Sequence, residues 1–293
     1  GYLLSGGVDS AAIVSAAADL SSAQIKTFSI GFDSKSFDEL PYAMLVANRY
    51  DTDHHELTVD TNIADILDKS VWAADEPLAD PSALPMYLVS QLTRQSVTVA
   101  LTGDGGDEAF GGYRRYYGIK FAQWYDRVPK LLRSRVLGPI ASRLPESGRK
   151  IDRVSQLKRF TIPATANPEE RYVGWLQIFP QSLKNTAYSD EFASLLDDCG
   201  RAPDPMLEAF VEVQDLDRTQ AAQWVDTMTY LPNDLMVKAD RMSMAHGLEL
   251  RSPFLDHELL EFAATIPTRM KVNGFKTKWV LKKAFENDLP QQI

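Results

Sequence analysis

The sequence predicts an α/β protein in which a parallel, doubly wound sheet is followed by a mainly helical region. Short apolar strand patterns alternate with helical patterns over residues 1–118, and two of these strands run directly into polar, glycine-rich loops. After Gly118 the strand patterns fade and long amphipathic stretches replace them. Strands that alternate with helices are joined by crossovers, so the sheet should be mostly parallel and covered on both faces.

Residues 1–118 are expected to form the α/β core. Short apolar and β-branched runs predict strands at Tyr2–Leu4, Ile25–Ile30, His54–Leu57 and Val97–Leu101. Apolar residues at helical spacing predict helices at Val8–Leu20, Glu39–Tyr50, Ile63–Ala74 and Ala83–Thr93. Asp60 or Thr61 is the expected N-cap of the third helix, because a short polar side chain can accept the unpaired N–H groups of a first turn.

Residues 119–293 are expected to form a mainly helical part. Amphipathic stretches predict helices at Ile119–Tyr125, Pro168–Phe179, Met206–Tyr230, Asp234–Ala245 and Lys278–Phe285. The block Asp234–Arg251 is interpreted as a helix, with Asn233 as its N-cap and Gly247 as its stop signal.

Composition excludes several classes of protein. Hydrophobic residues make up 44% and charged residues 24% of the chain, a balance typical of soluble globular proteins. The formal net charge of -9 disfavours a nucleic-acid partner, since an acidic surface repels phosphate backbones. A single cysteine, Cys199, excludes an internal disulfide and a multi-cysteine metal site. No membrane-spanning run or signal peptide is visible, so we expect a cytoplasmic protein with no membrane partner.

The sharpest local signal is the hexapeptide Ser-Gly-Gly-Val-Asp-Ser at Ser5–Ser10, between a predicted strand and an Ala-rich helix. Its two glycines allow a tight turn and a close approach of backbone to a ligand. The helix that follows begins with unpaired N–H groups and a positive dipole end, which suit phosphate oxygens. Asp9 beside a phosphate indicates a magnesium ligand. The alternative is a plain strand-to-helix turn with Asp9 as a favourable first-turn charge.

The second signal is an acidic glycine loop, Thr102–Glu108, which follows the strand Val97–Leu101. In a parallel sheet it should lie on the same edge as the phosphate loop. Asp104, Asp107 and Glu108 repel one another in so short a turn, and a divalent cation would relieve that repulsion. We interpret Asp107 as the partner of Asp9 in a shared metal site. A solvated acidic loop, with glycines that serve only the turns, is the alternative.

Together the two loops resemble a known family. Ser5–Ser10 resembles the PP-loop of the ATP pyrophosphatase superfamily, whose fold is adenine nucleotide α-hydrolase-like and which cleaves ATP between its α and β phosphates. The acidic loop continues into Phe110–Tyr113, and a third block, Leu231–Asp256, includes Lys-Ala-Asp-Arg-Met and Arg-Ser-Pro-Phe-Leu-Asp. These blocks are similar to the C-terminal PP-loop synthetase domain of the glutamine-hydrolysing asparagine synthetase family. β-Lactam synthetases share this domain.

The resemblance implies roles for the matching residues. The adenine and ribose of ATP would lie against Leu3, Ile30 and Gly31, with Thr102 and Gly103 completing the pocket. The pyrophosphate portion would be held by Ser5, Gly6, Gly7, Asp9 and Ser10, and magnesium by Asp9 and Asp107. The candidates for catalysis are Asp104, Asp107 and Glu108, with Glu108 near the acyl group and the incoming amine. Asp234 and Arg251 are substrate candidates.

The resemblance also implies a reaction and its partners. A carboxylate, most simply that of aspartate, would be activated by ATP and amidated with ammonia from glutamine. The ammonia would come from an N-terminal glutaminase domain of the same polypeptide, and a homodimer is compatible with the family. Because Gly1–Leu4 already has the pattern of a central strand, we expect the chain to be one domain of a longer protein.

Two alternatives stay open. The segment Asp75–Tyr87 corresponds to the region that lines the amino-acid pocket, yet it lacks the arginine of the aspartate-specific bacterial form. A related ligase, β-lactam-synthetase-like or specific for another carboxylate, is therefore the first alternative. A nucleotide-binding module without turnover is the second, although pure binding rarely needs a metal-binding acidic pair.

A last expectation concerns lysines. Family members carry a lysine in a basic stretch after a Leu-Pro pair, and this chain ends at Leu289–Ile293. Lys276 and Lys278 are expected to be ordinary first-turn helix residues. We therefore expect the 293-residue chain to bind ATP with magnesium but to hydrolyse no glutamine and make little or no amide.

Overall fold

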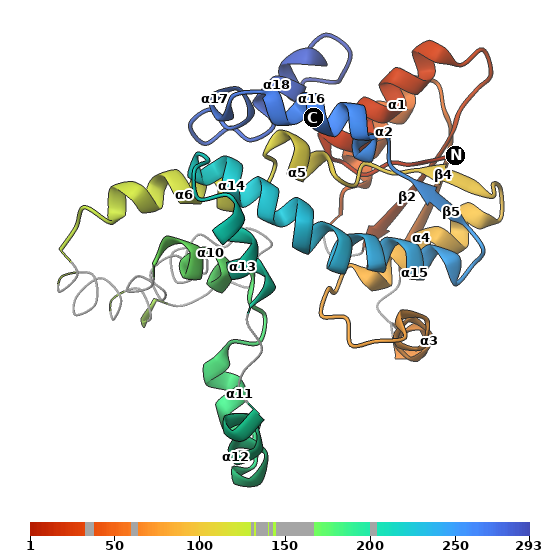
Figure 1. Cartoon of the computed structure of the whole chain (residues 1–293). Coiled ribbons are helices and arrows are strands. Elements are labelled where there is room, and N and C mark those ends of the chain that lie inside the picture. The colour runs from red at the N-terminus through yellow and green to blue at the C-terminus, as the bar shows by residue number, and fades with distance from the viewer. Residues whose placement is uncertain are drawn as a thin grey trace. The chain divides into compact units, whose positions relative to one another are not determined.

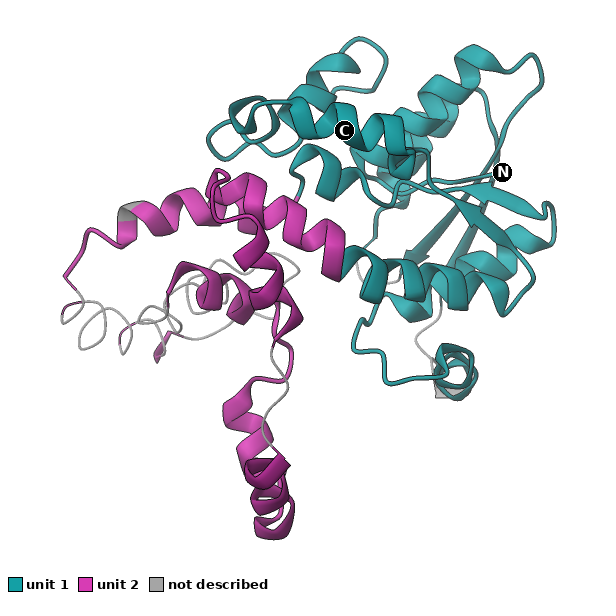
Figure 2. Ribbon diagram, in the orientation of Figure 1, with its two compact units in different colours: residues 1–112, 230–293 teal, residues 113–229 magenta. Residues whose placement is uncertain are grey.

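The computed structural model describes residues 1–32, 38–59, 64–129, 132, 140, 143–144, 167–199 and 204–293. It divides into two compact units, residues 1–112 with 230–293 and residues 113–229 (Figure 2). This division differs from the expected one at residue 118, because the last 64 residues, 230–293, return to the first unit. Residues far apart in the sequence therefore build the sheet and its surroundings together.

The first unit is built on a five-stranded parallel sheet (Figure 1). Its strands are β1 Tyr2–Leu3, β2 Lys26–Phe32, β3 Asp53–Val59, β4 Val99–Leu101 and β5 Glu249–Arg251. They lie in the order β3-β2-β1-β4-β5, and every neighbouring pair is parallel. The predicted fold class is thereby confirmed. Strand order reverses between β1 and β4, and ligands of open parallel sheets bind beyond the carboxyl ends of the strands at such a point.

Helices cover both faces of this sheet (Figure 1). One face carries α1 Val8–Leu20, α2 Leu40–Arg49, α5 Gly106–Phe110, α16 His257–Thr265 and α18 Trp279–Ala284, which share one apolar core. On the other, α3 Ala64–Ala74, α4 Ala83–Arg94 and α15 Val237–Met244 pack together. Short segments η3 Pro253–Leu255 and α17 Thr268–Lys271 complete the unit. The small side chains of α1 let it pack closely, since Ala11, Ala12 and Val14 are fully buried.

The helix predicted in the block Asp234–Arg251 is wrong at its start, whereas its expected stop at Gly247 is confirmed, because α15 ends at Met244 and Gly247 takes φ +68. Its start lies inside a π-helix, η2 Asp226–Met236, so Asn233 is not an N-cap. The last residues of the block, Glu249–Arg251, form the strand β5, and the N–H of Glu249 donates to Thr98 O at 3.0 Å. A backbone partner supplied by the β4 region outweighs the local helical pattern.

The first helices match their predicted positions closely, and α1 begins and ends as predicted. Asp60 and Thr61, the candidate caps of α3, lie outside the described residues.

The second unit is helical. Its helices are α6 Arg114–Tyr125, α10 Pro168–Leu176, α11 Gln181–Ala187, α12 Asp190–Cys199, α13 Pro205–Glu212 and α14 Arg218–Val225. Short polar caps explain several starts: Asn167 and Glu170 form a reciprocal capping box on α10, and Asp204 and Asp217 cap α13 and α14. The Asp217 cap also shows why the stretch Met206–Tyr230, predicted as one helix, is interrupted.

A buried ion pair joins three helical segments of the second unit. Asp226 Oδ2 accepts from Arg115 Nη2 at 2.8 Å, from the Tyr172 hydroxyl at 2.6 Å and from the Tyr116 hydroxyl. Asp226 and both tyrosines are fully or almost fully buried. Across the part of the chain that the structure describes, no helix combines the length and the apolarity needed to cross a membrane.

Candidate active site at the carboxyl edge of the sheet

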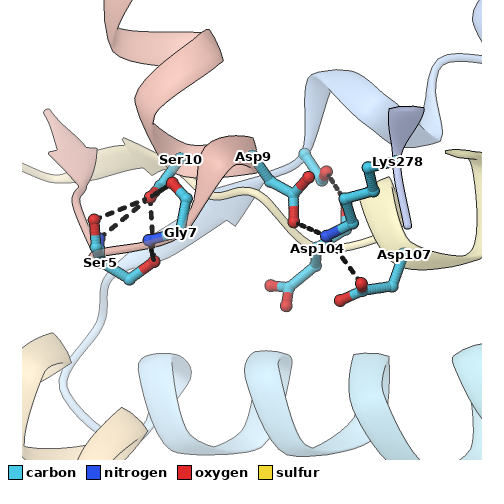
Figure 3. A network of polar contacts seen from close by, with 8 residues as sticks. Ser5, Gly7, Asp9, Ser10, Asp104, Asp107 and Lys278 are labelled. Atoms are coloured by element: carbon cyan, nitrogen blue, oxygen red, sulfur yellow. Dashed lines mark hydrogen bonds and ion pairs between the residues drawn. The ribbon is translucent and has the colours of Figure 1, made fainter. Parts of the chain in front are cut away.

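The phosphate-loop candidate, Ser5–Ser10, links β1 to α1 and is held by its own serines (Figure 3). The backbone N–H of Ser5 donates to Ser10 Oγ at 3.0 Å, and the two hydroxyls lie 2.9 Å apart. The N–H of Gly7 donates to Ser5 Oγ at 3.2 Å. A Cβ at Gly6 would lie 2.9 Å from Tyr42 Cβ, so glycine is required where the loop packs on α2.

The start of α1 is arranged to receive an anion. Gly7 is its N-cap, and no side chain in the described residues caps the helix there. The N–H of Gly6 already donates to a carboxylate oxygen, Glu39 Oε2, at 3.3 Å. Uncapped N–H groups and the positive end of a helix dipole together attract negative oxygens.

The acidic loop follows β4 and turns into α5. Its glycines are required because it packs directly on the first turn of α1. A Cβ at Gly103 would lie 2.9 Å from Asp9 Cβ, and a Cβ at Gly106 would lie 2.8 Å from Asp9 Oδ1. Gly105 takes φ +83, a conformation that glycine adopts without strain. The carboxylates of the acidic loop are thereby held against Asp9.

One ammonium group joins the two candidate metal ligands. Lys278 Nζ lies 2.6 Å from Asp107 Oδ1 and also donates to Asp9 Oδ2, so it sits between the two loops (Figure 3). The Lys278 side chain is 9% exposed. The structure thus brings Asp9 and Asp107 together on one sheet edge, as the strand pattern predicted. The expectation that Lys278 is an ordinary helix residue is wrong, whereas Lys276 is exposed.

The electrostatics of this cluster follow from burial. Burial raises the pKa of Asp9 to about 6, and the neighbouring Asp107 and Asp104 carboxylates add to the rise while Lys278 opposes it. Burial alone would lower the pKa of the Lys278 ammonium, but Asp9 and Asp107 outweigh it and raise that pKa above its ordinary value. Lys278 therefore stays charged, and one positive charge faces two carboxylates.

The other catalytic candidates lie in the same loop and helix. Asp104 accepts a hydrogen bond from Thr102 Oγ1 at 2.8 Å, and burial raises its pKa. Glu108 is 2% exposed, on α5. A buried carboxyl group at the carboxyl edge of a parallel sheet is suited to proton transfer or to contact with an amine.

The residues expected to meet adenine and ribose lie on the two strands next to the phosphate loop. Leu3 belongs to β1, and Ile30 and Gly31 are near the carboxyl end of β2. A Cβ at Gly31 would lie 2.2 Å from Leu40 Cδ1. Gly31 therefore has a packing role whether or not it contacts a nucleotide.

The two substrate candidates differ. Asp234 is half-buried, and burial, with Asp80 adding to it, raises its pKa while Lys238 and Tyr230 oppose the rise. Arg251 has a side chain that is 65% exposed and pairs with Glu249 at 2.8 Å. The structure therefore leaves Asp234 half-buried, near other polar groups, and directs Arg251 to an ion pair on its own strand.

A second lysine, Lys238 of α15, is also buried. Lys238 Nζ donates to Asp80 Oδ2 at 2.7 Å and to Ser82 Oγ at 2.8 Å, and its side chain is 7% exposed. Asp80 and Ser82 belong to the segment that lacks the expected arginine. A lysine from α15 thus supplies a cation to that segment.

Comparisons with known proteins agree on one family. The family model for asparagine synthase matches residues 1–293. The chain is 35% identical, over its whole length, to a glutamine-hydrolysing asparagine synthetase of Bacillus subtilis, and covers 44% of that protein. It is 33% identical to a putative glutamine-hydrolysing asparagine synthetase of Mycobacterium tuberculosis and covers 43% of it. An amidase of Penicillium rubens is 23% identical. The chain spans less than half the length of these relatives.

Proposed function

Because this chain belongs to the asparagine synthase family, we propose that it performs the ATP-dependent step of amide synthesis. A carboxylate of an amino acid attacks the α-phosphate of ATP, pyrophosphate leaves, and ammonia then replaces AMP on the acyl group. The observation that carries the proposal is the meeting of two loops from neighbouring parallel strands, which sets Asp9 and Asp107 against one cation.

The phosphate loop supports the first half of this reaction. Ser5 and Ser10 offer hydroxyls, and the first turn of α1 offers uncapped N–H groups to the leaving pyrophosphate. Such donors are held in place before the reaction, so they stabilise developing negative charge without reorganising.

The residues present fit magnesium. Asp9 Oδ1 is buried and has no hydrogen-bond partner among the described residues. A buried carboxylate oxygen without a partner is available to bind a metal ion. The same described part holds no group of three or more His, Cys, Asp or Glu side chains at metal-binding spacing. Two carboxylates suffice for magnesium, which takes its other ligands from substrate phosphates and water. When bound by Asp9 and Asp107, it would neutralise charge on the pyrophosphate.

The acidic loop supports the second half. Glu108 is buried and Asp104 is half-buried, and both lie in the same loop and helix as Asp107. We assign them to the acyl group and the incoming amine. Ammonia would come from a glutaminase domain of the same polypeptide, in keeping with the glutamine-hydrolysing relatives that extend beyond this chain. We assign the reaction to the cytoplasm.

Aspartate is the proposed acceptor, and one observation favours a second candidate. The segment 75–87 has no arginine, and its cation, Lys238, is already paired with Asp80. Because this lysine is already paired, the pocket would bind a second carboxylate of the substrate weakly. It would then suit an acid other than aspartate, as in β-lactam-type or other amide-forming relatives.

The test is pyrophosphate release by the complete polypeptide against a panel of carboxylic acids, with ammonium and magnesium supplied. We expect release that requires one amino acid, with aspartate first. Release with another acid would replace aspartate but keep the reaction. ATP cleavage to ADP, or none with any acid, would overturn the proposed function.

A further inference from the structure

The helical second unit contains a cavity that the proposed function does not use. Its volume is about 570 Å³, and pockets for small molecules usually measure about 300–1,000 Å³. All of its lining residues belong to residues 113–229, and most come from α10, from α13 and α14, which pack against one another, and from the short segment between α13 and α14 (Figure 1). None of the residues assigned to the reaction lines it.

The walls of this cavity are mainly apolar. Tyr172 of α10 and Phe210 of α13 meet edge to face, with their ring centroids 5.6 Å apart. Val211 and Leu216 also line the cavity, and they are 64% and 44% exposed. An apolar ligand would remove this surface from water, which is favourable. The cavity therefore suits a ligand with an apolar body.

Two charged residues of the lining are not used by the fold. Glu169 and Arg218 make no hydrogen bond or ion pair with any residue that the structure describes, including each other. The neighbouring Glu170 behaves differently, because its carboxylate accepts from the N–H of Asn167 at 3.2 Å in the capping box of α10. The cavity thus offers one carboxylate and one guanidinium that no local contact occupies.

The position of Arg218 argues against a role in holding α14 together. It is the first residue of that helix, where a positive charge opposes the helix dipole. Capping is already supplied by Asp217, whose carboxylate accepts from the N–H groups of Thr219 and Gln220. The Arg218 guanidinium is therefore available to an anion that enters the cavity.

We propose that this cavity binds a zwitterion with an apolar body, either a free apolar amino acid or a short apolar peptide. The carboxylate of the ligand pairs with Arg218, whose planar guanidinium suits bidentate contact. The ammonium of the ligand pairs with Glu169, and its apolar side chains cover Phe210 and Val211. The site goes beyond the proposed function, which needs no ligand in the second unit.

The first test titrates the complete polypeptide with leucine and with leucyl-leucine, by calorimetry. We expect at least one of them to bind, and an excess of aspartate not to displace it. Arg218→Gln and Glu169→Gln should each weaken binding about tenfold or more, the loss expected for one charge-assisted hydrogen bond. Glu208→Gln, at an exposed glutamate of α13 outside the cavity lining, is the matched control and should leave the affinity unchanged.

The second test uses blocked peptides to match each charge with its residue. N-acetyl-leucyl-leucine has no ammonium, so Arg218→Gln should still weaken its binding whereas Glu169→Gln should not. Leucyl-leucine amide has no carboxylate and should show the reverse. The proposal would be overturned if neither unblocked probe bound, if aspartate displaced the bound probe, or if the two cavity variants bound it as tightly as the wild type.

Discussion

Each of the two units contains a buried ion pair, but the two differ in the charges and hydrogen bonds that surround them. In the second unit, one arginine faces one aspartate, and Asp226 Oδ2 also accepts from the hydroxyls of Tyr116 and Tyr172. In the first unit, one lysine faces two aspartates. Each cluster leaves one buried aspartate oxygen, Asp226 Oδ1 or Asp9 Oδ1, without a partner among the described residues, so the two clusters differ in their charge balance. A charge-balanced cluster with extra internal donors stabilises a fold, whereas an unbalanced one at a sheet edge is suited to a ligand.

The largest effect is expected where the balanced pair is broken. Asp226→Asn leaves the buried Arg115 guanidinium without its counter-charge, so the free energy of unfolding should fall by about 3 kcal/mol or more. Chemical denaturation of the complete polypeptide measures it. Asp75→Asn, at an exposed pair with Arg241, is the control and should change little. A loss for Asp226→Asn as small as for the control would show that the buried cluster does not stabilise the unit.

A substitution in the unbalanced cluster of Lys278, Asp9 and Asp107 should change activity rather than stability. Asp107→Asn removes a carboxylate that neutralises charge near the pyrophosphate, so we expect magnesium-dependent pyrophosphate release to fall by about a hundredfold or more. The denaturation midpoint should stay close to that of the wild type. Asp240→Asn, at an exposed aspartate on α15, should keep full activity. Turnover near the wild-type rate would show that the reaction does not need the Asp107 carboxylate.

Gly112 lies against Asp107 and Lys278 and should be harder to replace than a glycine elsewhere. A methyl group at Gly112 would overlap Asp107 Oδ1 and Lys278 Cε, so Gly112→Ala should displace both charges. We expect pyrophosphate release to fall about tenfold, the equivalent of roughly 1.4 kcal/mol. Steady-state assays with the purified variant measure it, and an unchanged rate would mean that the loop relaxes freely around the new methyl group.

The smallest expected effect is a gain in stability rather than a loss. Gly118 lies inside α6, and a Cβ there would meet Trp175 at an ordinary contact distance of 3.5 Å. Alanine favours a helix over glycine, so Gly118→Ala should raise the free energy of unfolding by about 0.5 kcal/mol and leave activity alone. Thermal denaturation beside Gly112→Ala gives the matched comparison. A destabilised Gly118→Ala would indicate packing around α6 tighter than its contacts suggest.

Local patterns predicted much of the first unit. The strand before each loop, the glycines and the carboxylates are all local signals, and parallel pairing then requires Asp9 and Asp107 to share an edge. The strand β5 was missed because Glu249–Arg251 forms it through a partner at Thr98, which no local pattern reveals. The prediction ended the helix at Gly247 and gave no strand after it.

Sequence patterns could not identify the two buried lysines, Lys278 and Lys238. Lys278 lies two residues from an exposed lysine of the same type, and nothing in their spacing distinguishes the buried one. The conformation of Lys278 depends on Gly111 and Gly112, which are more than 160 residues earlier. Lys238 reaches Asp80 and Ser82 in the same way, across a contact between α15 and the segment before α4. Such contacts are determined by tertiary packing.

The most direct measurement of the central claim follows a heavy oxygen isotope from the carboxylate of the acceptor acid. If the carboxylate attacks the α-phosphate, one labelled oxygen must remain with AMP after ammonia forms the amide. We predict labelled AMP, unlabelled pyrophosphate and an amide that has lost one label, all dependent on magnesium. Labelled inorganic phosphate with ADP, or unlabelled AMP beside pyrophosphate, would contradict the proposal that this sheet edge forms an acyl-adenylate.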